Sequence, residues 1–307
     1  MLTDKIKNKE SHIVLYGITP PKANNSEERI KEISEKHLAR IKDLDIDGLI
    51  IYDIQDETAR THEERPFEFI HTVDPALYSR HYLKDLKVPR IVYRCVGNYT
   101  EENFKEWLEE DEDQLTVFVG TVASDQKVNL TLEQAYQLKK THNEAMLLGA
   151  VTIPERHKVL GDEDKRVGFK MDKGCRFFVS QAVYDLEASK AFLKDYKAYC
   201  TLNNIEMVPI IFTLTPCGST KTLKFIKWLG ISVPKWLEDT LLSSDEMLNK
   251  SLELIQMIYR ELMKYAEVEG IPIGCNIESV SIRKVEIDAS IELVKKISRM
   301  NAVDIKD

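Results

Sequence analysis

The stretch HIVLYGI, residues 12–18, is an apolar and β-branched run that is followed at once by Thr19, Pro20, Pro21 and Lys22. Proline lacks a backbone donor and disfavours helix at the residue before it, so a strand is expected to stop here. Seven further runs of this kind follow, separated by polar or amphipathic stretches long enough for helices. They are DGLIIYD (47–53), RIVYRCV (90–96), LTVFVG (115–120), LLGAVTI (147–153), RFFVSQ (176–181), EMVPIIFTL (206–214) and IPIGCNIES (271–279).

These eight runs indicate the fold class. Near-continuous apolar strands are typical of sheets buried on both faces, and their alternation with helices indicates right-handed βαβ units with a parallel sheet. Eight such units in 307 residues predict an α/β fold of the (β/α)8 TIM barrel type. A doubly wound open sheet is the alternative, because the number of strands does not by itself require closure.

The stretches between the runs predict the helices and the domain organisation. Helices are expected over 26–44, 100–110, 130–145 and 251–270, with Ser26 as an N-cap and Gly270 just beyond a C-terminus. The longest gap precedes the last run, so we expect extra helices there. We expect one domain over 1–307, with a flexible N-terminus over 1–11.

Composition excludes several classes of protein. The net charge of −8 and pI of about 5.6 give no global positive field that would attract nucleic acid or an anionic membrane. The five cysteines are scattered and never form a CxxC pair, which fits neither a disulfide framework nor a zinc site. No window approaches the ~20 apolar residues of a membrane helix, and the N-terminus lacks the apolar core of a signal peptide. We therefore expect a cytoplasmic protein with no metal site.

Polar residues follow the apolar runs at the points where strands should end. In a barrel these carboxyl ends carry the function. Tyr93 could point into the barrel or out to the helices, and Asp53 could equally cap a helix. Gln181 is an amide with donor and acceptor edges, which suits a ligand such as a pterin. The candidates at the tips are Gly17, Asp53, Tyr93, Thr121, Gln181, Thr213 and Glu278.

The segment PERHKVLGDEDKRVGFKMDKG, residues 154–174, is rich in basic side chains. The chain has neither GxGxxG nor GxxxxGK[ST], so a dinucleotide would have to be held in another way. Arg166 and Lys170 are i,i+4 on an expected helix and share one face, where they could meet a diphosphate. The alternative is a solvated face with salt bridges.

Seven segments resemble the methylenetetrahydrofolate reductase family. They are YGITPPK at the first strand, DGLIIYD, VPRIVYRCVG, the V-T-I-P-E-x-H segment of 151–157, MDKGCRFFVSQAVYD (171–185), PIIFTLTP (209–216) and WLGISVPKWLED (228–239). The resemblance runs over roughly 12–300. It implies a (β/α)8 barrel that uses FAD to pass a hydride from NAD(P)H to 5,10-methylenetetrahydrofolate, giving 5-methyltetrahydrofolate in one-carbon metabolism and methionine biosynthesis.

The resemblance also implies roles for single residues. Gln181 falls where the family contacts the pterin of folate, and Thr213 opens the loop that lies over substrate and nicotinamide. His157 and Lys170 fall where the family contacts the flavin. We group Tyr93 and Arg166 with these cofactor residues because of their places at the third strand tip and beside Lys170.

Two family carboxylates are missing from this chain. Gly17 stands where the resemblance implies a glutamate that helps to open the substrate's methylene bridge, and Val119-Gly120-Thr121 stand in place of R-G-D. A positioned acid contributes ~10²–10⁴-fold to such a step. Glu278 and Asp53, at the tips of the strands flanking the first, are the candidate replacement acids, and Glu278 is favoured because Gly17 leaves space for it.

Two functions remain open at this point. The scaffold favours an oxidoreductase acting on the CH–NH group of a folate, with NAD(P)H and with or without FAD. The missing carboxylates favour a non-redox folate-binding protein, or a partner subunit of a reductase or methyltransferase complex. The expected small-molecule partner is a folate. A homo-oligomer and a separate partner subunit both stay open, and neither nucleic acid nor a membrane is expected as a partner.

Overall fold

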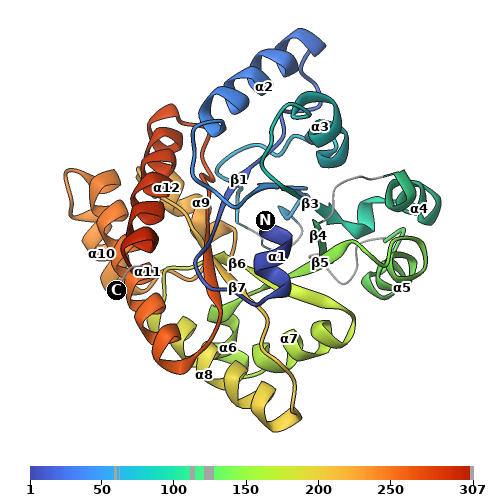
Figure 1. The fold of residues 1–307 in the computed structure, drawn as a ribbon. Helices are drawn as coiled ribbons and strands as arrows, with labels where there is room; N and C mark the ends of the chain where they lie inside the picture. The colour runs from blue at the N-terminus through green and yellow to red at the C-terminus, as the bar shows by residue number, and fades with distance from the viewer. Residues whose placement is uncertain (59–60, 62, 111–114, 121–127, 305–307) are drawn as a thin grey trace.

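The computed structural model describes residues 1–58, 61, 63–110, 115–120 and 128–304. Within them, parallel strands close into a barrel in sequence order, because β1 pairs with β8 as well as with β2 (Figure 1). The strands are β1 (Ile13–Ile18), β2 (Gly48–Ile51), β3 (Arg90–Cys95), β4 (Leu115–Val119), β5 (Leu147–Thr152), β6 (Cys175–Ala182), β7 (Ile210–Leu214) and β8 (Ile273–Ile277). The predicted (β/α)8 barrel is confirmed, and closure rules out the doubly wound sheet.

Helices surround the barrel and alternate with its strands (Figure 1). They are α1 (Leu2–Lys7), α2 (Glu27–Ile41), α3 (Pro75–Tyr82), α4 (Glu101–Glu110), α5 (Leu132–His142), α6 (Pro154–Leu160), α7 (Glu163–Asp172), α8 (Leu186–Asn203), α9 (Thr220–Trp228), α10 (Lys235–Leu242), α11 (Met247–Glu269) and α12 (Lys284–Asp304), with a 3-10 turn η2 (Val96–Asn98) after β3. The extra helices expected before the last strand are α9 and α10. None of the helices in the described ranges is long and apolar enough to cross a membrane.

The helix ends follow local chemistry. The Ser26 side chain accepts a hydrogen bond from the Arg29 amide at the start of α2, as the sequence predicts. At the end of α11, Gly270 adopts a left-handed conformation with φ of 66°, which a glycine takes without the steric cost of a Cβ.

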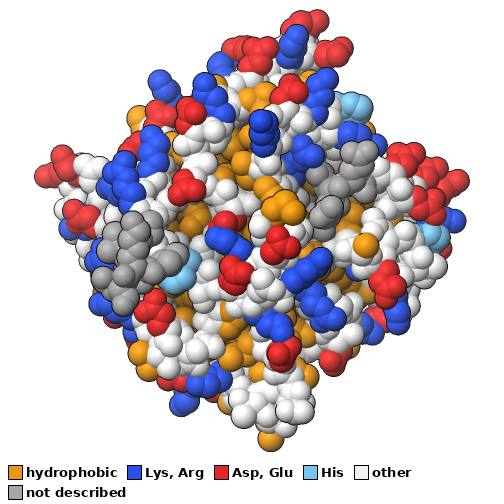
Figure 2. Space-filling model, in the orientation of Figure 1, with side chains coloured by type: hydrophobic (Ala, Val, Ile, Leu, Met, Phe, Trp, Pro, Cys, Tyr) orange, Lys and Arg blue, Asp and Glu red, His pale blue; other side chains and the backbone are white. Residues whose placement is uncertain are grey.

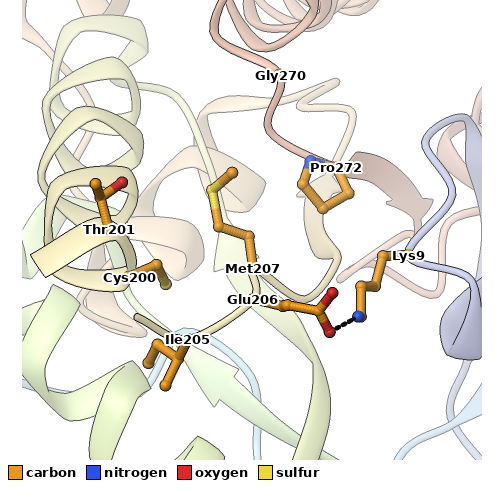
Figure 3. A pocket seen from close by; sticks show the side chains of 8 residues that line it. All are labelled: Lys9, Cys200, Thr201, Ile205, Glu206, Met207, Gly270 and Pro272. Carbon is orange, nitrogen blue, oxygen red and sulfur yellow. Dashed lines mark hydrogen bonds and ion pairs between the residues drawn. The ribbon is translucent and has the colours of Figure 1, made fainter. Parts of the chain in front are cut away.

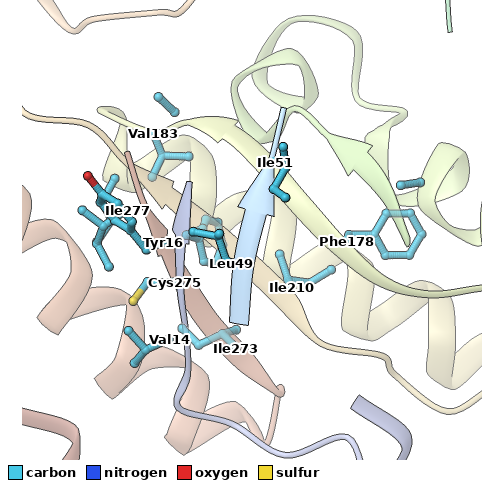
Figure 4. Close-up of a cluster of buried hydrophobic side chains, with 14 of the residues drawn as sticks. Val14, Tyr16, Leu49, Ile51, Phe178, Val183, Ile210, Ile273, Cys275 and Ile277 are labelled. Carbon is cyan, nitrogen blue, oxygen red and sulfur yellow. The ribbon is translucent and has the colours of Figure 1, made fainter. Parts of the chain in front are cut away.

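Two apolar layers hold the barrel. Side chains that point outward from the strands pack under the helices, as Figure 4 shows for β1, β2, β7 and β8. Side chains that point inward form a second cluster, because successive residues of a strand face opposite sides. Its members are Leu2, Ile6, Ile13, Leu15, Ile50, Ile91, Tyr93, Leu115, Val117, Phe177, Val179 and Ile211.

The N-terminal segment differs from the sequence expectation. Residues 1–11 were expected to be flexible, but Leu2–Lys7 form helix α1, and Leu2 and Ile6 are each 1% exposed. Both side chains join the cluster inside the barrel, and Figure 1 shows α1 across the end of the barrel that faces the viewer. The expectation is wrong for this helix because two apolar side chains, spaced four apart, close the floor of the barrel.

On the face drawn in Figure 2, acidic and basic side chains are interspersed, so neither sign dominates there. All five cysteines lie in the described part of the chain, where each is buried and free of any disulfide.

Candidate functional site

The carboxyl ends of the strands carry polar side chains that border solvent. Tyr52, Gln181 and Glu278 are half-buried at this end, next to half-buried apolar side chains of β4 and β5. We call this end the mouth of the barrel, as opposed to the floor that α1 closes. Active sites of this fold lie at the carboxyl end because the strand tips and the loops after them converge there.

A buried hydrogen-bond network crosses the mouth. The Asn276 side-chain amide of β8 donates to the Tyr52 hydroxyl at 2.7 Å and to Thr213 Oγ1 at 3.2 Å. The Tyr52 ring meets the Tyr93 ring edge to face, with centroids 4.9 Å apart. Tyr93 therefore points into the barrel, which settles the choice that the sequence left open. Tyr93 and Thr213, two of the predicted residues, thus contact this network, and Gly17, a third, lies against the Tyr52 ring.

Glu278 sits at the edge of the same network. Its carboxyl accepts a hydrogen bond from Thr215 Oγ1 at 3.1 Å and is hydrogen-bonded with the Tyr52 hydroxyl. Burial raises the pKa of Glu278, and the hydrogen bonds from Tyr52 and Thr215 offset this only in part. A carboxyl in such surroundings holds its proton more strongly than one in water and can donate it.

Gly17 leaves space that Tyr52 fills. A Cβ at position 17 would lie 2.7 Å from Tyr52 Cε2 and 3.2 Å from Asn276 Oδ1. The glutamate that the family resemblance implies at position 17 cannot coexist with the Tyr52 ring in this position. The loss of the acid and the gain of the tyrosine therefore belong together, and the space is not open for Glu278 as the sequence alone suggested.

We expect Gly17→Ala to destabilise the barrel. The Tyr52 ring is held by Tyr93 and its hydroxyl by Asn276, so it cannot move aside freely. Overpacking of this kind costs about 1–3 kcal/mol in the free energy of unfolding. Urea denaturation of Gly17→Ala, compared with the same change in a Tyr52→Ala background, checks this. An equal cost in both backgrounds would show that Tyr52 is not the obstacle.

Asp53, the other candidate acid, is committed elsewhere. Its carboxylate accepts hydrogen bonds from the Cys95 amide at 2.7 Å and from the Tyr99 hydroxyl at 2.9 Å. The same hydroxyl oxygen lies 3.0 Å from an oxygen of Asp74, which pairs with Arg94 at 2.7 Å. Asp53 thus fixes the end of β3 to the turn that follows, and of the two candidates Glu278 alone adjoins the Tyr52 network.

Gln181 is presented by an irregularity in β6. The register between β6 and β7 shifts between Val179 and Ala182, and the Ser180 hydroxyl fills the gap by accepting from the Thr213 amide at 2.9 Å. Such bulges re-aim side chains beside active sites. The Gln181 amide group donates to the Leu229 carbonyl at 2.9 Å, which fixes the side chain and leaves its oxygen for a ligand's donor.

His157 lies outside the mouth network. It is 6% exposed on α6, where Nε2 is 2.9 Å from an Asp195 oxygen of α8 and Nδ1 is 3.6 Å from an Asp164 oxygen of α7. Its ring also meets Phe192 edge to face. These contacts join three helices, so the structure gives His157 a role in packing.

Arg166 and Lys170 share α7, as predicted, but both have protein partners. Lys170 Nζ donates to the Val151 carbonyl of β5 at 2.6 Å, and burial lowers the pKa of this amine. Arg166 Nε is 3.3 Å from Glu163 Oε2, and the other Glu163 oxygen accepts from the Ile153 amide. The two basic groups hold α7 against β5 instead of forming a joint cation site.

These contacts test whether FAD fits. The residues that the resemblance assigns to the flavin, His157 and Lys170, are tied to the protein, and Gly120 with its neighbours replaces R-G-D. Thr121, the remaining substrate candidate, lies outside the described residues. The residues present do not fit FAD held in the family's manner.

The grooves found among the described residues lie near the opposite end of the barrel. Figure 3 shows one of about 340 Å³, whose lining includes Lys9, Glu206 and Pro272. Lys9 and Glu206 form an ion pair with each other. The groove adjoins the amino-terminal ends of strands, away from the predicted residues. The described residues also contain no cluster of three or more His, Cys, Asp or Glu that could hold a metal.

Tyr52 and Asn276 are the two residues of the mouth to which sequence reasoning gave no role. A signal for Tyr52 existed: residues 48, 50 and 52 alternate along β2, which places Tyr52 on the inward face with Ile50. Asn276 lies two residues before Glu278 in the last apolar run. Its Oδ1 is buried, faces position 17 and has no hydrogen-bond partner in the described structure.

The chain is similar to a solved structure over nearly its full length. A protein of Clostridium thermocellum that binds two copies of 5-methyl-5,6,7,8-tetrahydrofolic acid is 54% identical, with a TM-score of 0.87, and the match covers 97% of this chain and 99% of that one. Xanthomonas albilineans dihydropteroate synthase is 11% identical over 96% of this chain and 94% of its own, with a TM-score of 0.48, which is too distant to bear on activity. No curated protein matches. The sequence model of methylenetetrahydrofolate reductase matches residues 124–274, and the chain belongs to the methylenetetrahydrofolate reductase family.

Proposed function

We propose that this protein binds a reduced folate of the 5-methyltetrahydrofolate class in the mouth of the barrel, with the pterin against Gln181. The observation that carries this is the 54% identity, over nearly the full length of both chains, to a protein that binds 5-methyltetrahydrofolic acid. The half-buried polar groups of the mouth support it, since small-molecule sites place a few polar groups among apolar side chains.

Gln181 supplies the recognition of the pterin. Its amide group is anchored on the Leu229 carbonyl, so the free oxygen is held in one orientation before any ligand arrives. A pterin presents ring N–H and amino donors beside acceptors, and an amide can match both kinds of group. Because the anchor is already made, little side-chain entropy is lost on binding.

We expect Gln181→Leu to weaken folate binding by about 10–100-fold. The change removes a hydrogen-bond acceptor and leaves a pterin donor unpaired, which costs about 1–3 kcal/mol. Calorimetric titration with 5-methyltetrahydrofolate measures the effect. Gln256→Leu is the matched control, because Gln256 also donates to a carbonyl, that of Leu252, but on α11. Equal losses in the two variants would contradict the assignment.

A second candidate is reduction of 5,10-methylenetetrahydrofolate, and Glu278 favours it. Opening the methylene bridge requires a proton on the departing nitrogen. Burial raises the pKa of Glu278, and its carboxyl is hydrogen-bonded with the hydroxyl of Tyr52, the ring that lies against Gly17. In this reaction a nicotinamide supplies the hydride, and the chain binds the folate and protonates the nitrogen.

This reaction does not depend on FAD, because the residues that would hold the flavin in the family's manner have protein partners here. The remaining candidate is a folate-binding subunit that completes its site with another protein, which would show binding without turnover.

A further inference from the structure

In the connection between β2 and α3, residues Glu63 and Phe67 contact α9. Trp228 Nε1 donates to the Glu63 carbonyl at 3.0 Å, and the Phe67 ring meets the Phe225 ring edge to face at 5.1 Å. Lys221 Nζ lies 4.4 Å from the centre of the Phe67 ring. The connection begins at the tip of β2, so these contacts place it beside the mouth.

Arg65 is the centre of these contacts. Its guanidinium carbon lies 5.0 Å from the Phe69 and Trp228 ring centres and 5.5 Å from that of Phe225. Cation–π contacts of this kind orient a guanidinium but use none of its five N–H donors. The rings therefore hold Arg65 through the flat faces of its guanidinium group.

Two donor atoms of Arg65 are unmatched within the part of the chain that the structure describes. Nε and Nη1 are buried and have no hydrogen-bond partner among the described residues. The nearest carboxylate, Asp56, is 4.0 Å from Nη1, beyond hydrogen-bond range, and its side chain is 45% exposed. A charged group that is largely buried with unmet donors carries a free-energy cost, which an anionic ligand would offset.

The position of Arg65 links it to the proposed folate site. Trp228, against which Arg65 stacks, is followed in the chain by Leu229, whose carbonyl accepts the hydrogen bond from Gln181. A folate has a pterin at one end and a glutamate with two carboxylates at the other, joined by an aromatic ring. Residues 228 and 229 thus connect the anchor of Gln181 to the aromatic surface on which Arg65 rests, so a folate with its pterin at Gln181 could extend its anionic end toward Arg65.

We propose that Arg65 binds the glutamate carboxylates of the folate, with Phe69, Phe225 and Trp228 forming an apolar wall beside it. The inference rests on the proposed function, since it assigns the second end of the same ligand. A guanidinium matches a carboxylate with two parallel N–H···O bonds, which a single ammonium cannot do. The subsite therefore selects tetrahydrofolates with a glutamate tail over bare tetrahydropterins.

The test compares two ligands with two variants. Arg65→Met keeps an unbranched stem against the rings and removes the charge and the donors. Arg29→Ala removes an arginine that is 52% exposed on α2 and serves as the matched control for net charge. Affinities for 5-methyltetrahydrofolate and for 6-methyltetrahydropterin, which lacks the benzoylglutamate, are measured by calorimetry.

The expected result is selective. Arg65→Met weakens 5-methyltetrahydrofolate binding at least tenfold and leaves tetrahydropterin binding within twofold of wild type, and Arg29→Ala changes neither. Equal weakening of both ligands would overturn the inference, because Arg65 would then only anchor the 52–74 connection. No change for either ligand would also overturn it, and in both cases folate binding by the wild type would leave the proposed function standing. A wild type that binds neither ligand would remove both.

Discussion

Replacing Glu278 with glutamine is expected to lower the rate of 5,10-methylenetetrahydrofolate reduction by about 10²–10⁴-fold, the usual contribution of a positioned acid. Glutamine keeps the size of the side chain and an oxygen that can accept from Thr215. It has no acidic proton to give to the departing nitrogen. Folate affinity should change much less than turnover, because the pterin contacts of Gln181 are untouched.

One assay distinguishes the role of Glu278 from that of Asp53, the other candidate acid, and from that of FAD. Oxidation of NADH and of NADPH is followed with 5,10-methylenetetrahydrofolate as acceptor, with and without added FAD. Asp53→Asn should lower turnover far less than Glu278→Gln, and added FAD should not change the rate. Wild-type rates in the Glu278→Gln variant would remove Glu278 as the acid. A wild type that binds folate but oxidises neither nicotinamide would exclude reduction and favour the binding-subunit candidate.

The second large effect concerns stability and comes from Glu155. Its carboxyl is buried at the start of α6, where it is hydrogen-bonded to the backbone of Tyr184 and Asp185. Burial raises the pKa of Glu155 to about 8, with a smaller contribution from the Asp185 charge, and the backbone hydrogen bonds act in the opposite direction. The folded protein therefore keeps this carboxyl protonated at neutral pH.

The pKa shift fixes the sign of the pH dependence. The folded pKa is about 8 and the ordinary value is 4.5, so between these the folded state binds more protons than the unfolded state. The stabilisation of the folded state by protonated Glu155 is complete below pH 4.5 and is lost as the pH rises to about 8. Each pKa unit corresponds to about 1.4 kcal/mol, so the rise in pH across this range lowers the free energy of unfolding by roughly 3–5 kcal/mol through Glu155.

Glu155→Gln should abolish this dependence. Glutamine is neutral at every pH, so the difference in unfolding free energy between variant and wild type should grow in favour of the variant from pH 5 to pH 9. Urea denaturation at both pH values measures it. Glu187→Gln, on an exposed glutamate in the first turn of α8, is the matched control. Parallel pH curves for Glu155→Gln and wild type would contradict the raised pKa.

The sequence predicted the strands and the barrel because their signal is local. Apolar runs such as 12–18 and 147–153 are buried on both faces, and their spacing leaves room for one helix each. Helix α1 was missed because its amphipathic pattern is only six residues long. A segment of that length is stabilised by packing against the barrel floor, and propensity alone does not reveal this.

The site was predicted in part, for a related reason. Strand position was enough to bring Gly17, Tyr93 and Thr213 together, since parallel strands end at the same edge. It could not show which partner each side chain takes in three dimensions. His157 and Lys170 face helices and a strand carbonyl because α6 and α7 pack on α8 and β5. Arg65 was missed because its aromatic partner Trp228 lies far away in the sequence.

A crystal structure of the wild-type protein grown with 5-methyltetrahydrofolate tests the proposed folate site most directly. We expect the ligand at the carboxyl ends of the strands, with its pterin within hydrogen-bond distance of the Gln181 side chain. A crystal in which the ligand occupies the groove beside Lys9 and Glu206, or one in which the mouth stays empty at saturating ligand, would contradict it.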